Sequence, residues 1–263
     1  MSIQEYNFPI FFNSSPESGA LPVGILGNEF SVQLNNPIVV PRNAINCTVE
    51  ISSASIWNSS PNIADYIGNN KIYFTYLSVP HVILIPNGLY GSEDIDSLIG
   101  IYFSTNGLPR LFEISSNEAT QRVIIVFNNI CVIDFTQVGA CSDVLGFNNV
   151  VGPYATFPTY VTAPNTARFN RVEKYYIISN LIGGGIPQNS TSSGILARIP
   201  INVRNNSMIN YEPLSATRCD GTELIGMAKQ VINFRLVDQL LRNLSTFDED
   251  WSFCLNIRYY LKV

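Results

Sequence analysis

The feature of this chain that most limits its fold is a long succession of short apolar stretches in which polar residues alternate with apolar ones. Period-two alternation is typical of β-strands, because successive side chains point to opposite faces of a sheet. Turn residues separate the stretches, and scarcely any segment has helical spacing. The sequence therefore predicts an all-β fold, a single jelly-roll β-sandwich with one or two short helices and long loops.

The last predicted strand, 251–263, carries the clearest alternation. We expect strands at residues 30–34, 38–40, 47–57, 71–77, 81–85, 111–115, 121–127, 130–135, 171–179, 195–203, 208–211, 231–237 and 251–263. In 47–57, alternation places Cys47, Val49, Ile51, Ser53 and Ser55 on one face. Strand 251–263 is expected to lie in the middle of a finished sheet. Asn128-Asn129 is a candidate hairpin turn.

One segment has clear helical spacing. Apolar residues repeat at Ile95, Leu98, Ile99, Tyr102 and Phe103, which predicts a helix that ends at Asn106-Gly107. Ser92 is the expected cap, followed by acidic residues that favour the helix N-terminus. A second short helix is expected over 239–244, with Asp238 as its cap.

The segment 1–28 is rich in Pro, Gly and Ser and predicts an extended N-terminal arm. Its apolar anchors are candidate subunit contacts: Phe8, Ile10, Phe11 and Phe12. The alternative is an end that folds back on its own domain. Residues 29–263 are expected to form one jelly-roll domain, with 137–168 as a loop excursion or small insertion, because Gly and Pro interrupt every period there.

Composition limits the kinds of partner. Charged residues make up 13% of the chain, against about 25% in an average domain, and a weakly charged surface suits a protein packed against neighbours. The net charge of −5 and the absence of a Lys/Arg run disfavour nucleic acid. No stretch reaches the roughly 20 apolar residues of a membrane span, so we expect a soluble chain without a transmembrane segment.

No residue pattern points to catalysis, a cofactor or a metal. The single histidine, His81, begins an apolar stretch and has no nucleophile motif to accompany it. The five cysteines form no CxxC pair and indicate buried free thiols in a reducing compartment. Asp248-Glu249-Asp250 is better explained as a solvated turn than as a calcium site. Gly183-Gly184-Gly185 fits a long hairpin loop, since no phosphate-loop Lys follows. We predict that the chain is not an enzyme.

Several weak motifs in 30–263 resemble one known family. They are Leu34-Asn35-Asn36-Pro37 before the 47–57 strand, Pro61-Asn62-Ile63, HVILIPNGLYGSEDIDSLI at 81–99, SDVLGF at 142–147, YYIISNLI, GILARIPI, INYEP, INFRLVDQLLRNL and DWSFCLNIRY. These motifs and their order along the chain resemble those of the penton-type minor capsid proteins of virophages and Polinton/Maverick elements.

The resemblance implies a structural role. Such proteins form homopentamers at the fivefold vertices of icosahedral shells, beside hexon trimers of the major capsid protein. It implies a virion capsid assembled in the host cytoplasm or a virus factory. The family's partner protease prefers L-x-G-G-x, so Leu181, Gly183 and Gly184 become a candidate cleavage site. The alternatives are a lectin-like binding protein that uses the Tyr-rich segment 152–162, and a trimeric single jelly-roll major capsid protein.

Overall fold

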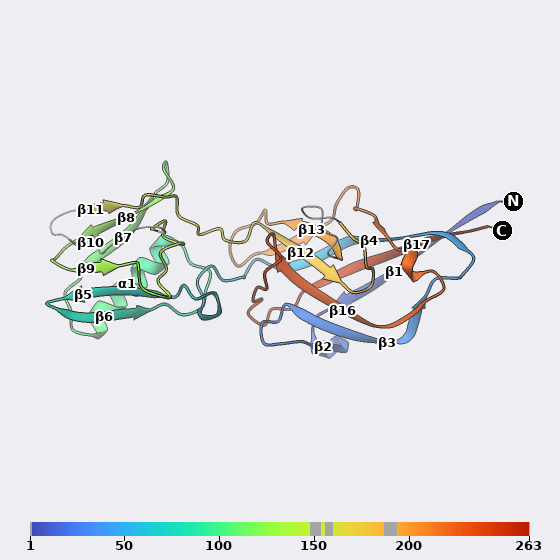
Figure 1. Ribbon diagram of the computed structural model, residues 1–263, viewed down its shortest axis with the longest axis horizontal. Helices are drawn as coiled ribbons and strands as arrows, with labels where there is room; N and C mark the ends of the chain where they lie inside the picture. Colours follow the sequence, from blue (N-terminus) through green and yellow to red (C-terminus); the bar gives the residue numbers. More distant parts are fainter. Residues whose placement is uncertain (1, 148–153, 156–159, 187–193, 263) are drawn as a thin grey trace. The chain divides into compact units, whose positions relative to one another are not determined.

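The computed structural model describes residues 2–147, 154–155, 160–186 and 194–262. The chain divides into two compact units. The first is made of residues 1–60 and 172–263 and is called here the split unit. The second, residues 61–171, is called the inserted unit because its chain leaves and rejoins the split unit (Figure 1).

The split unit is a sandwich of two antiparallel sheets. The first sheet has the order β1-β17-β4-β14, with β15 paired to β4, and the second has the order β13-β12-β16-β3-β2. Their strands are β1 (Ile3–Asn13), β2 (Ala20–Pro22), β3 (Glu29–Val39), β4 (Ala44–Trp57), β12 (Lys174–Ser179), β13 (Ile195–Pro200), β14 (Met208–Tyr211), β15 (Cys219–Asp220), β16 (Ala228–Asp238) and β17 (Ser252–Lys262). Short 3-10 turns lie at Pro16–Ser18 and Thr222–Leu224.

The strand order is that of a jelly roll. Leaving out the short β2 and β15, the chain visits the first sheet with β1, β4, β14 and β17 and the second with β3, β12, β13 and β16. The first strand lies beside the last, the second beside the last but one, and every pairing is antiparallel. This nesting is the pair of Greek keys that defines the fold, and the prediction of an all-β jelly roll is confirmed.

The core of the split unit lies between the two sheets. Val49, Ile51, Leu255 and Ile257 of the first sheet and Phe234 of the second belong to one buried cluster. Aromatic rings join the layers: Phe12 lies 4.6 Å from Phe234, and Phe30 lies 5.0 Å from Trp251, measured between ring centroids. Offset aromatic contacts of this kind add to the free energy gained by burial.

Strand β17 lies between β1 and β4 and pairs with both along most of its length. The expectation that this last strand lies in the middle of a finished sheet is therefore confirmed. Phe253, Leu255 and Ile257 all point into the core.

In β4 the predicted faces hold only up to Ile51. Leu255 pairs with Ile51 while Cys254 pairs with Ser53, so Ser52 is the extra residue of a β-bulge. The bulge shifts the alternation by one residue, and Ala54 and Ile56 face the core instead of Ser53 and Ser55. The expected placement of these two serines on the apolar face was wrong, because the bulge exchanges the two faces.

The N-terminal segment is a strand rather than a free arm. Strand β1 pairs with β17 from Ile3 to Asn13, and β2 pairs with β3. The prediction of an extended arm over 1–28 differs from this structure, and the alternative of an end that folds back on its own domain agrees with it, because Phe8, Ile10 and Phe12 of β1 pack on the core. Pro9 is compatible with the strand because β1 lies at the sheet edge, where a missing N–H removes no ladder bond.

The inserted unit has its own sheets and core. Its elements are a 3-10 turn at Asp65–Ile67, β5 (Lys71–Tyr76), β6 (Val79–Leu84), α1 (Ser92–Thr105), β7 (Phe112–Asn117), β8 (Arg122–Phe127), β9 (Val132–Asp134), β10 (Tyr154–Ala155) and β11 (Tyr160–Thr162). One sheet has the order β10-β9-β5-β6 and the other the order β11-β8-β7. Ile72, Ile99, Phe103 and Ile125 are among the buried residues that join these sheets to α1.

This division differs from the prediction of one domain over 29–263. The insertion between β4 and β12 spans 61–171, and the described parts of 137–168 belong to it. Strand alternation is the same in both units, so it does not indicate which strands share a sheet. For the same reason Asn128-Asn129 is not a hairpin turn: β8 and β9 lie in different sheets.

The predicted helix is α1, but its cap is not the predicted one. Gly91 precedes the first turn, and its N–H donates to Asp94 Oδ2 at 2.7 Å. Ser92 Oγ instead donates to Ser116 Oγ. Among the described residues, no helix has the length and apolar character needed to cross a membrane.

The second predicted helix, 239–244, is absent. Asp238 Oδ1 accepts the N–H groups of Leu240 and Arg242, and its Oδ2 accepts Arg242 Nε at 2.7 Å. Leu241 has φ near 62°, outside the right-handed helical region. The carboxylate of Asp238 thus stabilises a tight turn instead of capping a helix.

Candidate assembly surface

The face of the first sheet that points away from the core carries few unpaired charges, and it is called here the outer face. Strand registers place the odd-numbered residues of β1 and the even-numbered residues of β17 on it. Its neutral residues are Asn7, Asn13, Thr48, Ser53, Ser55, Asn210, Ser252 and Asn256. Amide and hydroxyl groups can bind many partner groups without desolvating a full charge.

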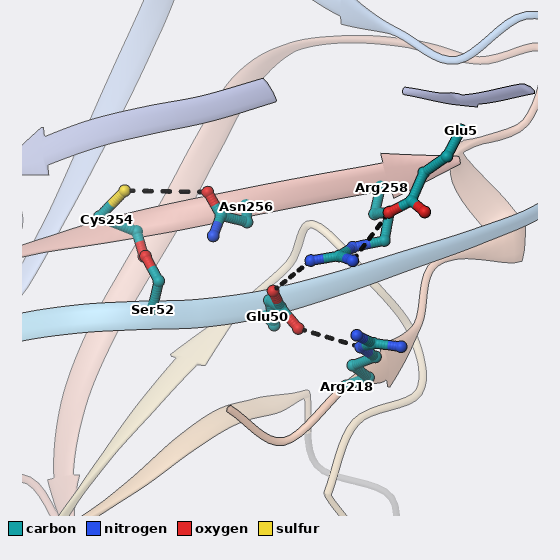
Figure 2. A network of polar contacts seen from close by, with 7 residues as sticks. All are labelled: Glu5, Glu50, Ser52, Arg218, Cys254, Asn256 and Arg258. Carbon is teal, nitrogen blue, oxygen red and sulfur yellow. Dashed lines mark hydrogen bonds and ion pairs between the residues drawn. The ribbon is translucent and has the colours of Figure 1, made fainter. Parts of the chain in front are cut away.

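Four charged side chains form a row across the outer face, called here the charge ladder (Figure 2). Arg258 Nη1 donates to Glu5 Oε1 at 2.8 Å, and Arg258 Nη2 donates to Glu50 Oε1 at 3.2 Å. Arg218 Nε donates to Glu50 Oε2 at 3.3 Å. Two guanidinium groups and two carboxylates alternate, so the row has no net charge.

Glu50 is the central member of the charge ladder. It is only 7% exposed, and each of its two carboxylate oxygens accepts one guanidinium N–H. Burial by itself lowers the pKa of Arg258, but Glu50 and Glu5 outweigh it, and the pKa is raised. A buried carboxylate without such partners would be unfavourable by several kcal/mol. The ladder therefore keeps the buried carboxylate of Glu50 paired on this face, where Lys262 and Asp220 are further charged residues near its edge.

Replacing Glu50 with glutamine should destabilise the split unit by about 2 kcal/mol, because Arg258 and Arg218 lose the charge that neutralises them. Trp57 and Trp251 are the two tryptophans of the chain and both lie in this unit. Denaturant unfolding followed by tryptophan fluorescence therefore measures the effect. The control is Glu212→Gln at an exposed position, expected to change stability by less than about 0.5 kcal/mol. Equal effects of the two substitutions would show that the ladder contributes no stability.

The predicted arm residues divide into two groups. Phe12 is buried, and Phe8 and Ile10 pack against the core of their own unit. Phe11 points to the outer face and is 79% exposed. Phe8 and Ile10 are half-buried, so Phe11 is the most exposed of the four, and the role of these residues as subunit contacts stays a prediction. A cleft of about 620 Å³ lies beside Phe11, and its lining includes Ser53 and Ser252 of the first sheet as well as Val32 and Leu34 of the second sheet.

The candidate cleavage site lies after β12. Leu181 is buried in the core, and the Gly183 N–H donates to Glu223 Oε2 at 2.7 Å. Gly184 has open space where a side chain would begin. Leu181 would have to leave the core for a protease to bind it in an extended conformation. Cleavage here stays a prediction, and residues 187–193 of the same loop lie outside the described residues.

The histidine and the cysteines, which are the side chains of this chain best suited to nucleophilic catalysis, pack against other residues of the fold. His81 stacks on Phe74 with ring centroids 4.8 Å apart. All five cysteines are buried free thiols, as predicted. Burial, with a smaller contribution from Asp220, raises the pKa of Cys47 to about 11, and burial raises that of Cys131 to about 11. These two thiols stay protonated near neutral pH and are poor nucleophiles.

The acidic turn 248–250 is exposed, and Asp248, Glu249 and Asp250 line a cleft with Glu29. In the part of the chain that the structure describes, no three His, Cys, Asp or Glu side chains converge on a point that could hold a metal. Most of the Tyr-rich segment 152–162 lies outside the described residues.

With the fold and the outer face established, the chain can be compared with known proteins. No family model and no curated protein matches it. The mavirus penton protein has a similar structure. The crystal structure of its selenomethionine-labelled form aligns over 98% of this chain and 100% of that chain, with a TM-score of 0.48 and 11% sequence identity.

Proposed function

We propose that this chain is a structural capsid protein, a penton subunit that packs against copies of itself to close a shell. The observation that carries the proposal is the outer face of the jelly roll, where the four central charges neutralise one another. The cores of protein interfaces are depleted in unpaired charges.

The composition supports the same function. A monomer that stays alone in solution keeps copies apart with an abundantly charged surface, whereas this chain has 13% charged residues. A ring needs one surface that meets a different surface on the next copy, and rotation then closes the assembly. A rigid sandwich suits this task because its sheets keep both surfaces in fixed relative positions.

More specifically, we propose that the chain forms a homopentamer at the fivefold vertices of an icosahedral virion capsid, beside hexon trimers of a major capsid protein. It rests on the motifs that resemble penton-type minor capsid proteins. The proposal includes assembly in the host cytoplasm or a virus factory and no direct contact with nucleic acid, in keeping with the net charge of −5. It assigns the chain no enzymatic activity.

Native mass measurement of the full chain tests this function. We expect a species of about five times the 29.2 kDa of one chain. A species of three chains would favour the trimeric major capsid protein instead. A chain that stays monomeric at high concentration and binds glycans in an array experiment would contradict the capsid function and favour the lectin-like alternative.

A further inference from the structure

We infer that the outer face is the surface that receives a second copy of this chain, with Phe11 as its apolar anchor and Arg218 as its charged anchor. The inference rests on the proposed function, because it names the surface through which the copies associate. It is argued from three properties of the face, namely the exposure of Phe11, the free end of Arg218, and the area and charge of the sheet.

Phe11 is an aromatic side chain that its own unit leaves uncovered. Its neighbours Ile10 and Phe12 point to the core, so strand alternation fixes Phe11 on the opposite side. It is 79% exposed and forms part of the wall of the 620 Å³ cleft. Aromatic side chains that become buried at the centre of an interface dominate the binding energy of many complexes. Phe11 provides an anchor of this kind.

Arg218 has one end fixed and one end free. Its Nε is held by Glu50, which Arg258 holds from the other side (Figure 2). The Arg218 side chain is still 54% exposed, and among the described residues its guanidinium has no partner besides Glu50. Arginine has five N–H donors in a planar fork that fits a carboxylate. Because Glu50 already orients the group, binding a carboxylate costs little additional side-chain entropy.

The area of the face fits a second copy. Eleven residues of β17 at about 3.3 Å each, and four strands about 4.8 Å apart, give a face of at most about 500 Å². A standard stable interface covers about 800 Å² per partner, so the sheet supplies more than half of that area and its flanking loops must supply the rest.

The charge of the face also fits a second copy. The chain has 20 acidic and 15 basic residues, and a sister copy therefore supplies carboxylates in excess, including the exposed turn 248–250. Because the charge ladder has no net charge, it adds nothing to the repulsion between two chains of net charge −5.

The test compares the self-association of the full-length chain with that of Phe11→Ser and Arg218→Ala, by native mass and by sedimentation over a concentration series. Phe11→Ser should raise the dissociation constant about 30-fold or more, as loss of a hot-spot anchor does. Arg218→Ala should raise it about 10-fold. Matched controls are Ile25→Ser, at an exposed apolar loop position, and Arg204→Ala, at an exposed basic one; both should change it less than threefold. Tryptophan fluorescence checks that each variant is folded.

Two outcomes would overturn the inference while leaving the proposed function intact. In one, the wild-type chain assembles and both variants assemble equally well. In the other, the controls weaken association as much as the variants do. If the wild-type chain itself stays monomeric, both the proposed function and this inference fail. Because Phe11 is exposed, Phe11→Ser tests the surface even if Arg218→Ala destabilises the fold through Glu50.

Discussion

Replacing Asn62 with alanine should lower the free energy of unfolding of the inserted unit by about 4 kcal/mol, since three buried polar groups lose their partner. The Asn62 side chain is completely buried. Its Nδ2 donates to Tyr90 O at 2.7 Å and to Phe169 O at 2.9 Å, and its Oδ1 accepts the Tyr90 N–H at 2.9 Å. It thereby joins the beginning of the inserted unit to its end.

Hydrogen exchange over a denaturant series measures this effect. Both tryptophans lie in the split unit, so fluorescence should report an unchanged transition while the amides of β5 and β8 exchange at lower denaturant. The matched control is Asn106→Ala, because the Asn106 side chain donates to Tyr102 O at an exposed helix end. We expect a loss below about 1 kcal/mol for it. Protection of the inserted unit that is the same in both variants would contradict the role given to Asn62.

Replacing Leu255 with aspartate should abolish folding of the split unit. Leu255 is fully buried in β17, the strand between β1 and β4. An isolated carboxylate there has no partner, and its desolvation costs several kcal/mol, as much as the whole stability of many domains. We expect tryptophan emission of an unfolded chain in the absence of denaturant.

The matched control is Ser252→Asp in the same strand. Ser252 lies on the outer face, where an added carboxylate stays in contact with water. It should change the stability by less than about 1 kcal/mol. If Leu255→Asp kept the native emission and a cooperative transition, β17 would not be the central core strand. If Ser252→Asp unfolded the unit as well, the assignment of the two faces would be wrong.

The candidate site shows where prediction from sequence ends. The exposed position of Phe11 follows from its place between Ile10 and Phe12 once β1 is known to be a strand, and the sequence did single this residue out. The charge ladder was not foreseen. Glu5 and Arg258 are 253 residues apart, and Arg218 and Glu50 are 168 residues apart. The only local sign of the ladder was Glu50, a charged residue between the apolar residues Val49 and Ile51.

The bulge in β4 shows the same limit at short range. Up to Ile51 the period of two assigns every side chain correctly, but the extra residue at Ser52 moves Ala54 and Ile56 to the core. The one local sign is that the apolar positions change from odd numbers (Val49, Ile51) to even numbers (Ala54, Ile56) across Ser52-Ser53, and the bulge itself arises from the pairing of β4 with β17. Pairing is a property of two segments, and a single segment does not contain it.

By itself, the sequence determined that the chain is built of β-strands, where most of these strands run, and that one amphipathic helix lies after residue 91. These are consequences of side-chain periodicity, which acts over a few residues and is visible in one segment. Tertiary structure alone decided that 61–171 form a separate unit, that β1 is an edge strand of its own sheet, and that four distant charges meet on the outer face. Strands with the same alternation of apolar and polar residues could each pair with any other, so the local pattern does not choose between neighbours. The choice is made when all apolar faces are buried at the same time.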